Sequence, residues 1–177
     1  MTRLHVRPEQ AGDFEAVEGV IAEAFGDSGR RVATLVERIR ASGAYEPELA
    51  LVGEDESGIV GHVMLSWVTL VGGGRPRVLN LSPVSVAPRR QRQGVGSTLV
   101  SAGLDLAEAR GEPVVIVEGI PEYYPRFGFE RASALGFEPP HAGIPDEAFM
   151  VKRLARYEPT VRGRIVYPRA FDVVVEA

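Results

Sequence analysis

A glycine-rich loop in the middle of the chain has the residue types of an anion-binding site. Two glycines follow three arginines there: Arg89, Arg90, Arg92, Gly94 and Gly96. If a helix begins at this point, its first backbone amides have no intrahelical partner, and the helix dipole favours an anion beside them. Glycines also let a phosphate approach the backbone closely. We therefore interpret the loop as a site for a small polyanion such as a pyrophosphate.

Two familiar nucleotide-binding loops do not fit this segment. A dinucleotide fingerprint needs a third glycine, and a P-loop needs a lysine followed by serine or threonine, and residues 91–96 have neither. The alternative is a tight solvated turn, in a soluble domain that binds no nucleotide. The three neighbouring arginines favour the anion site.

The loop lies between a predicted strand and a predicted helix. Apolar periodicity and glycine or proline breaks indicate strands near residues 4–6, 49–52, 59–71, 77–86, 114–117 and 148–154, with others after residue 129 and within 161–177. The same signals indicate helices over 13–25, 32–39 and 97–110, and a helical turn within 121–127. Pro83 marks an edge, a bulge or a place where its strand leaves a neighbour. This order predicts a single mixed α/β domain over residues 1–177, with 155–177 as a C-terminal extension packed on it.

The segment around the loop resembles the acyl-CoA-binding motif of the GNAT superfamily of N-acetyltransferases. Val84-Ser85-Val86-Ala87-Pro88 is followed by the pattern Gln-x-x-Gly-x-Gly at Gln91, Gly94 and Gly96. The order of elements along almost the whole chain is also similar to that family's. The resemblance implies a mostly antiparallel sheet flanked by helices and splayed between its fourth and fifth strands. It also implies acetyl-CoA as a co-substrate.

The resemblance also implies roles for the residues of this segment. The loop residues expected to hold the coenzyme A pyrophosphate are Gln91, Arg92, Gln93, Gly94, Val95, Gly96 and Ser97. On the strand before them, Val84, Ser85 and Val86 stand where the family's strand contacts the thioester and the pantetheine arm. Where the two strands part, unpaired backbone groups need partners, and the peptide-like pantetheine arm can supply them.

A second motif is the segment of residues 121–129, which resembles the family's Tyr-x-x-x-Gly-Phe. Tyr124 stands four residues before Gly128, where the family's tyrosine protonates the departing thiolate. A phenol with a pKa of about 10 is a feasible donor to a thiolate of slightly lower basicity. Tyr124 is therefore the expected catalytic acid, and Tyr123 is expected to pack or to contact substrate. The alternative is that both tyrosines are packed aromatics.

Two departures from the family's pattern affect the coenzyme contacts and the general base. Many relatives have an asparagine where Glu118-Gly119-Ile120-Pro121 stands here, although Gly-x-Pro-x-Tyr-Tyr resembles a predicted bacterial subgroup. No glutamate stands in the fourth strand, where some relatives place a base; Asn80 is there instead. The open alternatives for the base are Glu118, Glu23, Asp27, a water, or no base at all if the amine arrives neutral.

Composition and charge exclude several other classes of protein. The 177 residues include no cysteine, which excludes disulfides, thiolate metal sites and a cysteine-linked acyl intermediate. A net charge of -4 disfavours broad nucleic-acid binding. The three histidines lack ligand spacing, so no metal is expected. With no signal-like N-terminus and no apolar run long enough for a membrane, a cytoplasmic location without membrane contact is expected.

The function predicted from these features is direct acetyl transfer from acetyl-CoA to a primary amine of a small molecule or peptide. The alternative is a non-catalytic acyl-CoA-binding regulatory module on the same fold, which the missing glutamate favours. The acceptor is expected to contact the early helices, residues 26–31 and residues 134–146. The last strands could pair between two copies of the chain, so a homodimer is possible.

Overall fold

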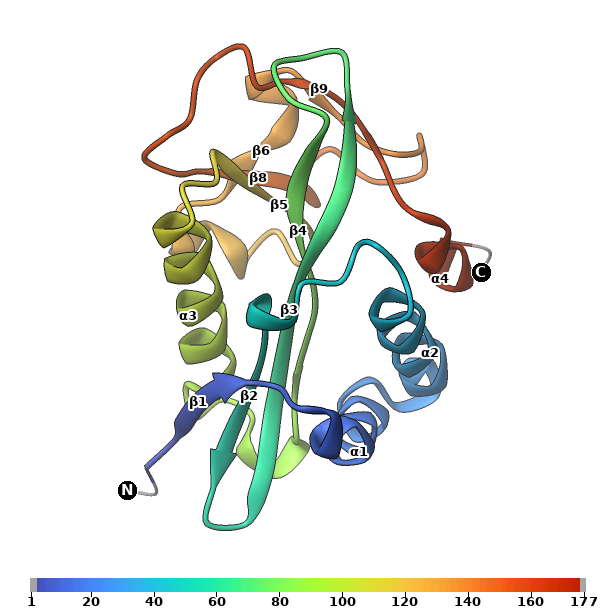
Figure 1. The fold of residues 1–177 in the computed structure, drawn as a ribbon, viewed down its shortest axis with the longest axis vertical. Helices are drawn as coiled ribbons and strands as arrows, with labels where there is room; N and C mark the ends of the chain where they lie inside the picture. The colour runs from blue at the N-terminus through green and yellow to red at the C-terminus, as the bar shows by residue number, and fades with distance from the viewer. Residues whose placement is uncertain (1–2, 176–177) are drawn as a thin grey trace.

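The computed structural model describes residues 3–175, which fold around one twisted sheet (Figure 1). The order of paired strands is β1-β2-β3-β4-β5-β8-β6, and β9 pairs with both β3 and β7. The strands are β1 (His5–Pro8), β2 (Ala50–Asp55), β3 (Gly58–Val71), β4 (Arg77–Val86), β5 (Val114–Glu118), β6 (Glu130–Arg131), β7 (Phe137–Glu138), β8 (Phe149–Arg153) and β9 (Gly163–Val166). Only β4–β5 and β7–β9 are parallel pairs within the described residues. The mixed, mostly antiparallel sheet confirms the predicted fold class.

Helices cover both faces of the sheet. In Figure 1, α3 (Val95–Ala109) lies on one side, and α1 (Phe14–Phe25), α2 (Gly29–Arg40) and α4 (Asp172–Val175) lie on the other. Nowhere in residues 3–175 does a helix combine the length and the apolar character that crossing a membrane requires.

The helices form because their apolar residues recur at helical spacing. On α2, the buried residues Val32, Leu35, Val36 and Ile39 follow the i, i+3, i+4, i+7 pattern of an amphipathic helix. On α1, Val17, Val20 and Ile21 are buried. Phe25, the last residue of α1, is 36% exposed.

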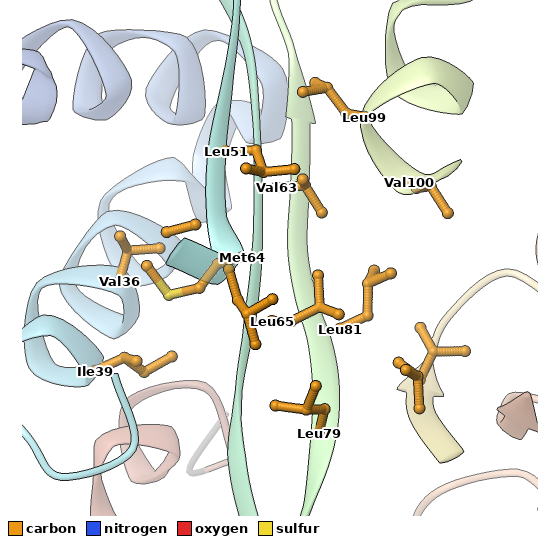
Figure 2. Close-up of a cluster of buried hydrophobic side chains, with 14 of the residues drawn as sticks. Val36, Ile39, Leu51, Val63, Met64, Leu65, Leu79, Leu81, Leu99 and Val100 are labelled. Atoms are coloured by element: carbon orange, nitrogen blue, oxygen red, sulfur yellow. The ribbon is translucent and has the colours of Figure 1, made fainter. Parts of the chain in front are cut away.

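The alternation of β3 sends neighbouring side chains to opposite layers. Met64 lies beside Val36 and Ile39 of α2, whereas Leu65 lies on the side of α3 (Figure 2). A Cβ at Gly103 of α3 would come within 2.7 Å of Leu65 Cδ1, so the glycine lets the helix approach the sheet.

A bulge and a splay interrupt the sheet at β4. Val63 of β3 is in register with Val84, but Leu65 is in register with Leu81, so β4 has one extra residue around Pro83. β4 pairs with β5 only at Leu79–Val115 and Asn80–Ile116, and the two strands part beyond those pairs. The bulge is one of the three alternatives that Pro83 left open, and the splay confirms what the family resemblance implied.

The tail supplies β9 and α4. β9 is antiparallel to β3 and parallel to β7. Ile165 on β9 is fully buried, and Phe171, just before α4, is 3% exposed. The residues after β8 therefore lie against both the sheet and α2 (Figure 1).

A buried polar cluster joins β1, α2 and β3. The Glu9 carboxylate accepts hydrogen bonds from Arg40, with Arg40 Nη2 to Glu9 Oε2 at 2.6 Å, and from the Tyr45 hydroxyl at 2.9 Å. His62 Nε2 lies 3.1 Å from Glu9 Oε2. Burial alone would raise the pKa of Glu9, but the contacts with His62 and Arg40 outweigh it and lower the pKa to about 2.

Candidate active site

A cavity of about 960 Å³ opens where β4 and β5 part. Segments far apart in the sequence line it: α1, α2, β4, the glycine loop, the end of β5, the turn around Tyr124, and residues beyond 140. Its lining residues are Ala24, Phe25, Val32, Leu35, Asn80, Leu81, Ser82, Pro83, Val84, Val86, Gln91, Arg92, Gly96, Glu118, Gly119, Ile120, Tyr123, Tyr124, His141, Ala148, Tyr167, Phe171 and Val174. A concave, largely apolar space with a few polar groups is typical of a small-molecule site.

The glycine loop opens α3, two residues before the predicted start at 97. Gly94 caps the helix in the left-handed region, with φ of 85°. The first intrahelical bond runs from the Thr98 amide to the Gly94 carbonyl at 2.9 Å. The amides of residues 95–97 therefore have no carbonyl one turn back to bond, as an anion site at a helix end requires.

Two of the three arginines already have acidic partners. Arg90 Nη1 lies 2.6 Å from Asp55 Oδ2, and Arg89 Nη1 lies 3.8 Å from Glu23 Oε2. Arg92 lines the cavity and has no carboxylate within ion-pair distance among the described residues. The cluster of three cations expected from the sequence therefore reduces mainly to Arg92.

Two glutamine side chains of the loop donate hydrogen bonds to nearby backbone carbonyls. Gln91 Nε2 donates to the Val86 carbonyl at 3.0 Å, and Gln93 Nε2 donates to the Arg89 carbonyl at 2.9 Å. One carbonyl of the strand expected to contact pantetheine therefore already has a partner.

The other expected coenzyme residues divide into two groups. Val84, Val86, Gln91, Arg92 and Gly96 line the cavity. Ser85, Gln93, Gly94, Val95 and Ser97 do not; of these, Ser85 is 2% exposed and in register with His62 of β3.

Tyr124 lies between the loop and the end of β5. Its ring is 5.1 Å from that of Tyr123, and Tyr123 OH lies 3.5 Å from Ser97 Oγ at the start of α3. On the other side, the Tyr124 ring packs so closely on Gly119 that any Cβ at Gly119 would collide with it. Tyr124 is 8% exposed, and burial, helped by Tyr123, raises its pKa to about 12. Tyr124 therefore lines the cavity with its phenol protonated at neutral pH.

A second set of polar residues lines the far end of the cavity. Tyr167 OH donates to Glu118 Oε2 at 3.3 Å, and the Tyr167 ring stacks on Phe171 with 4.5 Å between centroids. Burial and the nearby Glu118 carboxylate raise the pKa of Tyr167. Asn80 also lines the cavity, 1% exposed. Tyr167 and Phe171 were not recognised from the sequence because no motif marks them.

Of the three carboxylates considered as a base, one lines the cavity. Glu118 does, whereas Glu23 lies beside Arg89 outside the lining and Asp27 is also outside it. His141, considered from the sequence only as a metal ligand, lines the cavity too. No group of three or more histidine, aspartate or glutamate side chains in the described part of the chain is arranged to hold a metal ion.

Comparison with known proteins finds a family and close relatives. A family model described as an acetyltransferase (GNAT) domain matches residues 5–132. The Escherichia coli K12 protein named uncharacterized N-acetyltransferase YjhQ is 33% identical over 160 residues, which cover 88% of this chain and 85% of that protein. YhbS of the same strain is 31% identical over 151 residues, 85% of this chain and 87% of that protein.

Solved structures agree with this assignment. The crystal structure of E. coli YhbS in complex with CoA matches with a TM-score of 0.86 and 28% identity, covering 97% of this chain and 93% of that one. A GNAT family acetyltransferase from Brucella melitensis, in complex with acetyl-CoA, matches with a TM-score of 0.77 and 28% identity, covering 96% and 99%. The family model and these relatives agree with the splayed sheet and with the glycine loop at the start of α3. The chain therefore belongs to the GNAT family of acetyltransferases.

Proposed function

We propose that this protein transfers an acetyl group from acetyl-CoA directly to a primary amine. The observation that carries the proposal is that the glycine loop and Tyr124 meet at one cavity, where β4 and β5 part. A site for a pyrophosphate and a proton donor for a thiolate would then lie along the same space. The coenzyme complexes of the YhbS and Brucella proteins support the choice of ligand.

The donor would bind along the cavity from the loop to Tyr124. The backbone amides of Val95, Gly96 and Ser97, with the Arg92 guanidinium, would hold the pyrophosphate. Backbone groups of Val84, beyond the last β4–β5 pair, would hydrogen-bond the amides of the pantetheine arm. This places the thioester end toward Tyr124 and Glu118.

The reaction would proceed without a covalent enzyme intermediate. The neutral amine nitrogen forms a bond to the thioester carbon, and the tetrahedral intermediate then breaks its carbon–sulfur bond. The sulfur leaves with the electron pair and takes the proton of the Tyr124 phenol, which is later restored from solvent. The nitrogen loses its extra proton, so the products are an acetamide and the free thiol of coenzyme A.

Glu118 is the base that we propose for the incoming ammonium. It is the candidate carboxylate that lines the cavity, and it directly precedes the glycine on which Tyr124 packs. A carboxylate there could take the proton that the ammonium must lose before it attacks. With a base in the cavity, the absence of a glutamate from β4 no longer favours a non-catalytic module.

Two measurements test the proposal: calorimetry with coenzyme A, and thiol release from acetyl-CoA with a panel of primary amines. The Gly96→Leu variant should lose coenzyme binding, because even a Cβ there would lie 3.3 Å from Tyr123 OH and 3.4 Å from Val86 Cγ2. The matched control is Gly19→Leu on α1, where a Cβ has open space. Coenzyme binding without thiol release from any amine would support the regulatory module instead, and no binding would reject both.

A further inference from the structure

Two side chains that can accept hydrogen bonds, Asn80 and Glu118, line the same cavity from two neighbouring strands. Asn80 on β4 is in register with Ile116 on β5, and Glu118 is two residues beyond Ile116 and so on the same face. Asn80 Oδ1 is buried without a hydrogen-bond partner in the described residues, although Asn80 lines the cavity. A buried oxygen without a hydrogen-bond partner needs a donor. A single ammonium group could donate hydrogen bonds to both Asn80 Oδ1 and the Glu118 carboxylate.

Most of the other side chains at this end are apolar. Phe25 comes from α1, Val32 and Leu35 from α2, and Phe171 and Val174 from the tail. Phe171 and Tyr167 present two stacked rings, with planes 28° apart. Ile120 at the same cavity is 65% exposed and Phe25 is 36% exposed, so large apolar side chains are left uncovered where a ligand would enter. Such a wall favours an apolar ligand body.

The charges around the cavity restrict the acceptor further. Among the described lining residues, Arg92 is the only arginine or lysine, and it belongs to the loop end. Apart from the exposed His141, a carboxylate on the acceptor would find no basic side chain, and an unpaired buried carboxylate is costly. Glu118 is the only carboxylate in the same lining, so a second ammonium group would meet apolar side chains.

We infer that the acceptor is a primary monoamine without a carboxylate, carried on an aryl or alkyl body. Glu118 and Asn80 hold its ammonium end, and the wall formed by α1, α2 and the tail holds its apolar end. The inference rests on the proposed acetyl transfer and adds the class of acceptor to it.

Four amines separate the features of this acceptor. 2-Phenylethylamine has the full set, phenylalanine adds a carboxylate to the same body, ethanolamine removes the apolar body, and spermidine adds further ammonium groups. We expect kcat/KM for 2-phenylethylamine to exceed that of each of the others by at least about 10-fold. Equal or better use of any of the other three overturns the acceptor class while acetyl transfer stands. No thiol release with any of the four overturns the inference, and the proposed function itself falls if a wider amine panel also fails.

A pair of variants tests Asn80 without relying on loss of fold. Asn80→Leu removes a buried unpaired polar group, so the variant should be at least as stable as the wild type while KM for 2-phenylethylamine rises roughly 10-fold or more. Ser66→Ala is the matched control: Ser66 is in register with Asn80, its Oγ is also buried without a partner in the described chain, and it does not line the cavity. KM for acetyl-CoA should stay unchanged in both. An unchanged amine KM in Asn80→Leu overturns the role of Asn80.

Discussion

At the scale of single residues, Tyr124 and Gly119 act as one unit. The glycine leaves the space that the ring occupies, and the ring's burial keeps its phenol protonated. A pKa raised from 10.0 to about 12 makes the phenol a weaker acid than free tyrosine, by about 1.4 kcal/mol for each unit. The dry surroundings at the same time strengthen a hydrogen bond from the phenol to a departing sulfur. The proposed role is therefore donation in the transition state to a thiolate that forms beside it.

Replacing Tyr124 by phenylalanine should lower kcat by roughly 10²–10⁴-fold, because the departing thiolate loses its proton donor. Steady-state thiol release measures this, with Tyr123→Phe as the control that keeps the aromatic cluster and the donor. In the wild type the Tyr124 phenol should stay protonated until the pH approaches its pKa of about 12. A fall in kcat below pH 10 must therefore come from another group. Unchanged turnover in Tyr124→Phe would reject the role.

Gly119→Ala should reduce kcat nearly as far as removal of the phenol does, because the new Cβ forces the Tyr124 ring out of place. The KM for acetyl-CoA should change less, since the loop residues are untouched. Gly43→Ala, at a position with open space around the new Cβ, is the control. Full activity in the Gly119 variant would mean that the position of the ring does not limit the reaction.

At the scale of elements, the sequence predicted the strands and helices that position the donor end. Pro83 indicated an interruption in β4, which the structure shows to be a bulge, and the glycine pair indicated the start of α3 to within two residues. The sequence could not show that Arg90 is paired with a carboxylate, because its partner Asp55 is brought beside it only when β3 pairs with both β2 and β4. Counting the charged residues in a sequence does not reveal which of them form ion pairs in the folded protein.

The Glu9 cluster should make the stability of the fold depend on acid pH. The pKa of Glu9 is lowered from the usual 4.5 to about 2. The stability that the ionised Glu9 carboxylate contributes is therefore fully present above about pH 4.5 and is lost as pH falls toward 2. The shift corresponds to roughly 3 kcal/mol. Urea unfolding at pH 6 and pH 3 should show this loss in the wild type.

Between pH 6 and pH 3 the Glu9→Gln variant should lose clearly less stability than the wild type, and the loss that remains comes from carboxyls such as Asp13, whose pKa is also lowered by its hydrogen bond with Arg7. The variant should also be less stable than the wild type at pH 6 by about 3–5 kcal/mol, because the Arg40 charge loses its buried partner. Glu56→Gln, in an exposed turn, should behave as the wild type. An identical pH dependence in Glu9→Gln and the wild type would contradict the assignment to Glu9.

At the scale of the whole molecule, the two ends of the cavity differ in how the chain builds them. The proposed donor end comes largely from residues 84–97, one continuous stretch whose motif can be recognised. The proposed acceptor end combines residues from α1, α2, β4, β5 and the tail, which come together only in the folded protein. The family model likewise stops at residue 132, before His141, Tyr167 and Phe171. The donor could therefore be predicted from the sequence and the acceptor could not.

Coenzyme binding should stabilise the whole domain. At a free coenzyme A concentration of 100 times Kd, the free energy of unfolding should rise by about 2.7 kcal/mol, which for a chain of this size raises Tm by roughly 5–11 °C. Thermal unfolding with and without coenzyme A measures the shift. Gly96→Leu should show none, and Gly19→Leu should show the full shift. A shift of equal size in both variants would place the coenzyme away from the loop.

The pairing of β9 with both β3 and β7 has a consequence for how the protein is made. Synthesis runs from the N-terminus, so the ribosome releases β4, the glycine loop and Tyr124 well before β9 and the rings of Tyr167 and Phe171. The residues proposed to bind the donor are therefore made before Tyr167 and Phe171, the part of the proposed acceptor wall that the tail supplies. In the proposed mechanism, selection of the amine therefore depends on the last segment of the chain to be synthesised.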